Sequence, residues 1–141
     1  MRGKVFLVQW DATSAAERAD TLRREGWKVD VECENGGRAY RHIRTSVPDV
    51  VVLDLGKKPS HGREVGSALR AIRATRDIPI VCIEEGDEAR EQTRLRIEGV
   101  RFSTDGDLPY ELVDAAHDHA RASRRLKAVP RTSHTSSPTR R

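Results

Sequence analysis

The sequence of 141 residues contains only two cysteines and no long apolar run, and each shortage excludes a class of protein. Cys33 and Cys82 have no CxxC spacing and no companion histidine cluster, which argues against a zinc site or a thiol-redox centre. No stretch approaches the roughly 20 apolar residues of a membrane helix. Met1 to Lys4 lead directly into an apolar run without a signal-peptide pattern. We therefore expect a cytoplasmic protein that makes no membrane contact.

The sequence also lacks the motifs that mark common catalytic sites. It contains no Ser/His/Asp spacing, no HExxH motif and no glycine-rich phosphate loop. The five histidines are scattered, and the two closest, His117 and His119, do not share a helix face. We expect no separate enzymatic activity.

Acidic residues are absent from the last 21 positions, so the net charge of +4 conceals two different parts. Residues 1–120 hold 19 basic against 22 acidic residues, a net charge of −3, whereas residues 121–141 hold seven basic residues. From Val129 onward the chain is polar and has no apolar periodicity, so burial cannot offset the entropy lost on ordering. We predict one folded domain over residues 1–126 and a basic, disordered tail over residues 127–141.

The body of the sequence repeats a strand-then-helix pattern. Parallel neighbouring strands need helical crossovers between them, so this alternation predicts an α/β fold with a doubly wound parallel sheet. The expected strands are residues 5–8, 27–31, 50–54, 78–83 and 100–103, and the expected helices are residues 14–25, 37–46, 62–74, 88–97 and 109–126.

An acidic residue ends the third expected strand. Val50 to Leu53 are apolar without alternation, which is typical of a strand that is buried on both faces. Asp54 follows at the carboxyl end of that strand, and this edge of an open α/β sheet is where ligands bind. The alternative is an aspartate that only caps the following turn.

A longer motif surrounds this aspartate. Pro48 to Leu55 read PDVVVLDL, Gly62 follows eight residues after Asp54, and Ile78 to Ile80 read IPI. With this motif, residues 3–120 resemble the receiver domain of two-component response regulators. The resemblance implies a flavodoxin-like five-stranded sheet of strand order 2-1-3-4-5 with five flanking helices. It also implies that Asp54 occupies the position of the aspartate that accepts a phosphoryl group from a histidine kinase.

The metal-binding part of the family's pocket is only partly kept. The family has a pair of acids after the first strand to hold Mg²⁺, and here Asp11 matches the second acid while Trp10 replaces the first. The ligands that remain for Mg²⁺ are Asp11, Asp54 and the backbone carbonyl of Gly56, and oxygen donors of this kind suit that ion. Trp10 is either a lid packed on neighbouring loops or a partner contact.

Two switch positions of the family carry acids in this sequence. Glu84 stands where the family has serine or threonine, and Asp105 stands where it has a near-invariable lysine. An ionised carboxylate cannot donate a hydrogen bond to a phosphoryl group, and it repels that group by about 4 kcal/mol at roughly 4 Å and an effective dielectric near 20. No lysine lies between residues 101 and 120, so Lys57 and Lys58 are the only cations expected to compensate.

These residues predict a stand-alone receiver-like signalling module with a degenerate phosphorylation pocket, which acts through protein–protein interaction. The alternative is a conventional response regulator that a histidine kinase phosphorylates at Asp54 and that signals to a downstream protein. A further hypothesis is that Asp11, Asp54, Glu84 and Asp105 converge on one rim, where like charges recruit a divalent cation or keep a carboxyl protonated.

The family's usual docking surface is made by the fourth helix, the fifth strand and the fifth helix. Here that surface is rich in arginine, which favours a homodimer or an acidic partner; the residues are Arg90, Arg94, Arg96 and Arg101. Phe102 matches the aromatic position whose rotamer reports phosphorylation in the family. The basic tail suggests a function of another class, an adaptor that binds nucleic acid or an acidic partner weakly and without sequence preference.

Overall fold

Strands and helices alternate along the described part of the chain, as the sequence pattern predicts. The computed structural model describes the backbone of residues 2–136 and the side chains of residues 2–122 and 124. The strands are β1 (Gly3–Val8), β2 (Trp27–Glu32), β3 (Val50–Asp54), β4 (Ile80–Ile83) and β5 (Arg101–Ser103). The helices are α1 (Ala12–Arg24), α2 (Gly36–Ser46), α3 (Pro59–Ala71), α4 (Asp87–Arg96) and α5 (Leu108–Ser136).

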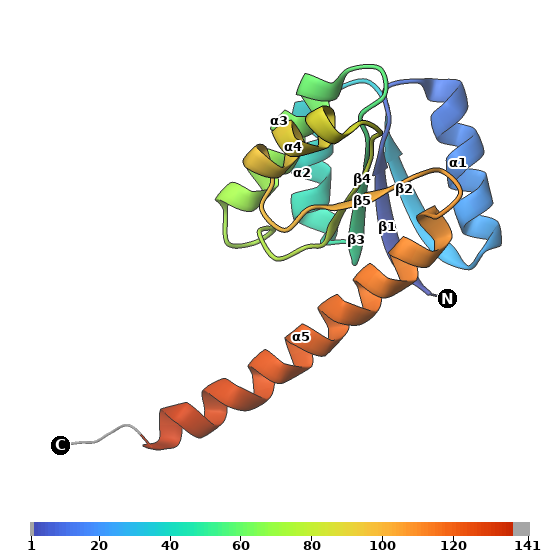
Figure 1. Cartoon of the computed structure of the whole chain (residues 1–141). Coiled ribbons are helices and arrows are strands. Elements are labelled where there is room, and N and C mark those ends of the chain that lie inside the picture. The colour runs from blue at the N-terminus through green and yellow to red at the C-terminus, as the bar shows by residue number, and fades with distance from the viewer. Residues whose placement is uncertain (1, 137–141) are drawn as a thin grey trace.

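The five strands form one parallel sheet in the order β2-β1-β3-β4-β5, which confirms the predicted flavodoxin-like fold. Helices α1 and α5 cover one face of the sheet, and α2, α3 and α4 cover the other (Figure 1). Each face has its own core cluster. Because all strands are parallel, their carboxyl ends meet at one edge, and the loops that follow them lie close together.

Strand β3 is the centre of the sheet and is buried on both faces. Val50 and Val52 pack with α1 and α5, whereas Val51 and Leu53 pack with the helices of the opposite face. All four side chains are fully buried. The strand therefore fixes the position of Asp54 at its end from both sides.

Helix α1 begins earlier than the sequence suggests. The expected first residue is Ser14, in a capping box, but the helix begins at Ala12, with Asp11 as the N-cap residue. The Ser14 hydroxyl donates a hydrogen bond to the Asp11 carboxylate, so Ser14 contacts the N-cap side chain from within the first turn of the helix.

Helix α5 continues to Ser136, whereas the sequence predicts an end near Leu126. Its last part extends away from the sheet and the other helices (Figure 1). A helix without tertiary packing is only marginally stable in water, so the disorder of the tail over residues 127–141 stays a prediction. Residues 137–141 lie outside the described part of the chain.

Within residues 2–136, no helix has both the length and the apolar character that crossing a membrane requires.

Candidate functional site

Asp54 lies at the carboxyl end of β3, between the ends of β1 and β4. Its Oδ1 accepts a hydrogen bond of 2.9 Å from the backbone N–H of Gly56. Asp54 therefore does cap the turn that follows β3, which was the alternative interpretation of this residue. Its side chain is nevertheless 17% exposed and borders two cavities. Asp54 therefore caps the turn and faces a space that a small ligand can enter.

A guanidinium group lies beside Asp54. Arg18 Nη2 is 3.3 Å from Asp54 Oδ2 and 2.6 Å from Asp105 Oδ1. Arg18 Nε donates a hydrogen bond of 3.0 Å to the side-chain oxygen of Gln9, which follows β1 and is buried. The expectation that Lys57 and Lys58 are the only compensating cations is therefore wrong.

The position of Arg18 on α1 explains why it reaches the site. Ala15 and Leu22 lie three residues before and four residues after it, and both are buried against the sheet. Residues at these spacings share a helix face, so Arg18 points toward the sheet edge. The sequence signal for Arg18 is therefore a basic residue on the face of the first helix that otherwise carries buried apolar residues.

Lys57 lies near another acid of the predicted rim. Its Nζ is 4.0 Å from Asp11 Oδ1, and its side chain is mostly exposed. The hydrogen bond from Ser14 is the main cause that lowers the pKa of Asp11, and the charge of Lys57 adds to it. Lys58 is the exposed N-cap residue of α3.

Glu84 follows β4, and its carboxylate is held by the neighbouring helices. Arg63 Nη2 on α3 is 2.9 Å from Oε2, and the hydroxyl of Thr93 on α4 donates a hydrogen bond of 2.6 Å to Oε1. Glu84 and Thr93 are buried, and the side chain of Arg63 is 13% exposed. The charge of Glu84 is thus compensated inside the protein, which weakens the repulsion that the sequence predicts for a phosphoryl group.

The four acids do not form an unpaired cluster. In the described part of the chain, no group of three or more histidine, cysteine, aspartate or glutamate side chains is arranged to hold a metal ion. Each acid instead lies next to a basic side chain: Asp11 next to Lys57, Asp54 and Asp105 next to Arg18, and Glu84 next to Arg63. The acids of this rim are therefore not uncompensated, and a metal or pH response of the rim stays a prediction without that support.

Two cavities meet at Asp54 and Asp105, and both residues border each of them. The first, of about 470 Å³, lies beside α1 and the start of α5 and includes Arg18. The second, of about 450 Å³, lies beside α3 and the β4–α4 loop and includes Arg63 and Glu84. The aspartate is thus open to solvent on a side that Arg18 does not border.

Trp10 packs against its neighbours within the domain. Its ring meets the ring of His61 edge to face at 6.0 Å, and it lies against the core cluster of the α2–α4 face. Its indole Nε1 is buried without a hydrogen-bond partner among the described residues. These contacts support the structural interpretation of Trp10 over a partner contact.

No protein-family model matches this sequence, and a search of curated proteins finds no match. Solved structures do resemble it. The receiver domain of a signal transduction histidine kinase from Syntrophus aciditrophicus is 19% identical, with a TM-score of 0.69 over 82% of this chain and 91% of that one. A chemotaxis response regulator of Vibrio cholerae is 19% identical, with a TM-score of 0.65 over 82% and 97%.

The receiver domain of a sensor histidine kinase from Pseudomonas aeruginosa, which has a magnesium ion in its active-site cleft, is 17% identical. Its TM-score is 0.70 over 82% of this chain and 98% of that one. The chain has the receiver-domain fold. This confirms the fold that the PDVVVLDL motif implies.

The predicted docking surface of this receiver fold holds its arginines in three different settings. The guanidinium groups of Arg90 and Arg94 each lie 5.1 Å from the centre of the Phe102 ring, a cation–π geometry. Arg90 Nε also donates to the backbone carbonyl of Glu84, at 2.7 Å. Phe102 is thus connected to the end of β4 through Arg90, a coupling that the sequence does not reveal.

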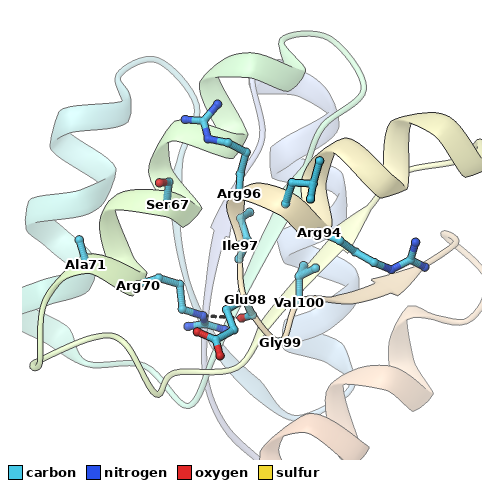
Figure 2. Close-up of a pocket in the computed structure, with 10 residues that line it drawn as sticks. Ser67, Arg70, Ala71, Arg94, Arg96, Ile97, Glu98, Gly99 and Val100 are labelled. Atoms are coloured by element: carbon cyan, nitrogen blue, oxygen red, sulfur yellow. Dashed lines mark hydrogen bonds between the residues drawn. The ribbon is translucent and has the colours of Figure 1, made fainter.

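The other two arginines of this surface face elsewhere. Arg101 forms ion pairs with Glu111 and Asp118 of α5, so its charge is already matched within the domain. Arg96 and Arg94 point in different directions around a hollow of about 560 Å³ between α3 and the turn before β5 (Figure 2). Arg70, which also borders this hollow, donates to the carbonyl of Glu98 and so fastens that turn to α3. It also donates to the carbonyls of Arg76 and Ile78, in the connection between α3 and β4.

Proposed function

We propose that this protein is a receiver-type signalling module of a two-component system, which accepts a phosphoryl group at Asp54 and acts through contacts with other proteins. The observation that carries the proposal is the guanidinium of Arg18, 3.3 Å from the Asp54 carboxylate. Phosphoryl transfer depends on positioning and on neutralising negative charge, and a fixed arginine next to the acceptor supplies that charge.

The charge balance of the pocket supports this proposal over a silent receiver. Each of the acids Asp11, Asp54, Glu84 and Asp105 lies within 4.0 Å of a basic group, and these basic groups are Arg18, Lys57 and Arg63. In the pattern of the family that the sequence resembles, a pair of acids and the acceptor face one lysine. Because Arg18 lies beside both Asp54 and Asp105, the replacement of that lysine by Asp105 does not leave the acceptor without a neighbouring cation.

The reaction would convert the Asp54 carboxylate into an acyl phosphate. A carboxylate oxygen forms a bond to phosphorus while the phosphorus–nitrogen bond of a phosphohistidine breaks, and the imidazole leaves and takes up a proton. Asp54 is held for this step by the buried β3 and by the N–H of Gly56. Arg18 balances the charge that the phosphoryl group brings.

In this proposal Asp11, Asp54 and the carbonyl of Gly56 would hold a magnesium ion. Asp11 and Asp54 follow the neighbouring strands β1 and β3, and oxygen donors of this kind are the type that Mg²⁺ prefers. The ion would shield the oxygens of the transferred group from the carboxylates. It would compete with Lys57 for Asp11 and with Arg18 for Asp54.

The experiment is to incubate the full chain with phosphoramidate and Mg²⁺ and to measure its intact mass. We expect an increase of one phosphoryl group in the wild-type chain and none in Asp54→Asn. Asp49→Asn is not a suitable control because Asp49 accepts a hydrogen bond from the backbone of Lys4, whereas Asp107→Asn changes an exposed aspartate near the same edge. An adduct that persists in Asp54→Asn would contradict the proposed acceptor.

The silent-receiver interpretation remains the second candidate, because Glu84 has no hydroxyl and is fastened to Arg63 and Thr93. It predicts no adduct at Asp54 together with unchanged partner binding in Asp54→Asn. A homodimer through α4, β5 and α5 also remains a proposal, supported by the exposed Leu95 and Tyr110. The adaptor function of the basic tail stays a prediction.

A further inference from the structure

One nitrogen of Arg18 serves two carboxylates. The distance from Nη2 to Asp105 Oδ1 is 2.6 Å, whereas the distance to Asp54 Oδ2 is 3.3 Å, so the closer contact is with Asp105. The two acids differ in setting, because the side chain of Asp105 is 77% exposed and that of Asp54 is 17% exposed. An ion pair with an exposed partner is weakened by solvent, so Asp105 holds Arg18 only loosely despite the short distance.

A phosphoryl group on Asp54 would change this competition. It carries more negative charge than a carboxylate and offers three acceptor oxygens. It would also lie at the more buried of the two acids, where a charge-assisted hydrogen bond is stronger. The guanidinium should therefore turn from Asp105 toward Asp54 when the phosphoryl group arrives.

Gln9 allows the guanidinium to change partner while Arg18 stays in the site. Its buried side-chain oxygen accepts the hydrogen bond of Arg18 Nε, while the Nη2 group is the one that contacts the two acids. The inner part of the guanidinium is thus anchored, and only its outer end has to change partner.

We propose that Arg18 is the cation that binds the phosphoryl group of Asp54, and that its transfer from Asp105 to that group releases the turn between β5 and α5. This inference rests on the proposed function and adds to it how the modified aspartate is sensed. Asp105 lies in the turn that ends with Asp107, directly before α5. The release would therefore reach the first turn of α5, which contains the exposed Tyr110.

The test compares phosphorylation rates of charge-changing variants, using phosphoramidate as the donor and intact mass as the readout. In this reaction an Asp54 oxygen binds phosphorus, the phosphorus–nitrogen bond breaks and ammonia leaves. Arg18→Gln should slow labelling by about ten- to a hundredfold, the loss expected for one hydrogen bond to a charged group. Arg18→Lys should recover part of the rate, because lysine keeps the positive charge but lacks the paired N–H donors of a guanidinium.

Asp105→Asn tests the release step. It removes the competing charge at an exposed position, so we expect labelling several-fold faster than in the wild-type chain. The backbone amide signals of residues 104–107 in NMR spectra should shift on phosphorylation of the wild type. In unphosphorylated Asp105→Asn, these signals should already lie nearer the shifted positions.

Matched controls separate these effects from general changes of charge or folding. Arg24→Gln removes an arginine from the exposed side of α1, and Asp107→Asn removes an aspartate from the same turn as Asp105. Both controls should be labelled at the wild-type rate. Circular dichroism of Arg18→Gln and Arg18→Lys identifies a loss of fold, and Asp105→Asn tests the proposal independently because its side chain is exposed.

The outcomes distinguish this inference from the proposed function. Equal labelling of wild type and Arg18→Gln would overturn the role of Arg18 and leave Asp54 as the acceptor. Labelling that depends on Arg18 without any shift at residues 104–107 would overturn the release of the turn. A wild-type chain that takes up no phosphoryl group at Asp54 would overturn both.

Discussion

At the scale of single residues, Glu32 shows how a buried carboxylate is stabilised by the loop that follows its strand. Its side chain accepts hydrogen bonds of 3.0 Å from the backbone N–H groups of Glu34 and Asn35, and two more from the guanidinium of Arg38. The bonds from Arg38 are the main cause that lowers the pKa of Glu32 from about 4.5 to about 2. This carboxylate joins the end of β2 to the start of α2.

Replacing Glu32 by glutamine should lower the free energy of unfolding by about 1.5–3 kcal/mol, the range for hydrogen bonds to a charged group. A glutamine has one acceptor oxygen for four donors, and its amide group also faces them. Urea unfolding at pH 7 measures the effect. Glu34→Gln is the control, because Glu34 is 75% exposed and shares the same arginine, and it should cost less than about 1 kcal/mol.

The same residue gives a pH dependence with a defined sign. Because the pKa of Glu32 is lower in the folded protein, its stabilisation is complete above its unfolded pKa near 4.5 and is lost as the pH falls toward about 2. Wild-type stability should therefore fall more steeply across this range than that of Glu32→Gln. Parallel curves for the two proteins would show that the carboxylate is not stabilised by folding.

Val47 is strained where α2 ends. It has φ 45° and ψ 71°, in the left-handed region that a β-branched residue rarely adopts, and its side chain is about half exposed. Val47→Asn should raise the free energy of unfolding by about 1 kcal/mol, since asparagine tolerates this conformation. Thr45→Asn, at an exposed position within α2, should not stabilise the protein. Thermal unfolding followed by circular dichroism compares the two.

At the scale of secondary-structure elements, α3 packs closely because of two glycines on its buried face, Gly62 and Gly66. A Cβ atom at Gly66 would lie 2.3 Å from Ile97 Cδ1, and one at Gly62 would lie 2.1 Å from a methyl carbon of Leu55. The helix therefore reaches its position over the sheet only without side chains there. Its closeness to β3 and α4 is what allows Arg63 to reach Thr93 and Glu84.

Gly66→Ala should destabilise the domain by about 1–3 kcal/mol, because overpacking forces neighbouring side chains to move. Ile97→Val removes the Cδ1 atom that a new methyl group would meet, so the double variant should lose less than the sum of the two single variants. Denaturant unfolding of the four proteins in this cycle measures the coupling. Ser67→Ala, at the neighbouring partly exposed position, should change stability by under about 0.5 kcal/mol. Additive effects would show that Gly66 is not in contact with Ile97.

At the scale of the whole molecule, the fold could be predicted because apolar runs and helix faces repeat with clear spacing. Val50 to Leu53 define a strand buried on both faces, and Asp54 therefore lies at the sheet edge. The partners of the acids could not be predicted in this way. Arg18 is 36 residues from Asp54 and Arg63 is 21 residues from Glu84, so their meeting depends on how α1 and α3 are rotated on the sheet.

The length of α5 shows a different limit of the sequence pattern. Apolar periodicity reports packing, and among the described side chains the last one that joins a core cluster is Ala116. Ala120, Arg121 and Leu126 are strong helix formers, but they leave no apolar periodicity beyond the packed part of the helix. Residues 127–136 include Pro130 and four serine or threonine residues, so propensity does not predict the continuation to Ser136 either. Periodicity therefore locates the packed part of α5 and not its end.

This division of α5 predicts that the segment after Leu126 is dispensable for the domain. A chain ending at Leu126 should unfold at the same temperature as the full chain, within about 1–2 °C, because the described core is complete by Ala116. It should also show the same mass increase with phosphoramidate, since Asp54 and Arg18 are unchanged. Calorimetry and intact mass measure both properties.

The same truncation tests whether the basic segment binds nucleic acid. Removing Lys127, Arg131, Arg140 and Arg141 takes away four of the seven basic residues of positions 121–141, so any binding to a short DNA duplex should weaken and depend less steeply on salt. A matched full-length variant with these four residues changed to glutamine separates charge from chain length. If truncation weakens binding and the glutamine variant does not, the contact is not electrostatic, and the adaptor hypothesis fails.

If truncation lowers the unfolding temperature and the glutamine variant does not, the extension of α5 stabilises the domain through its backbone or apolar residues, and the domain boundary lies beyond Leu126.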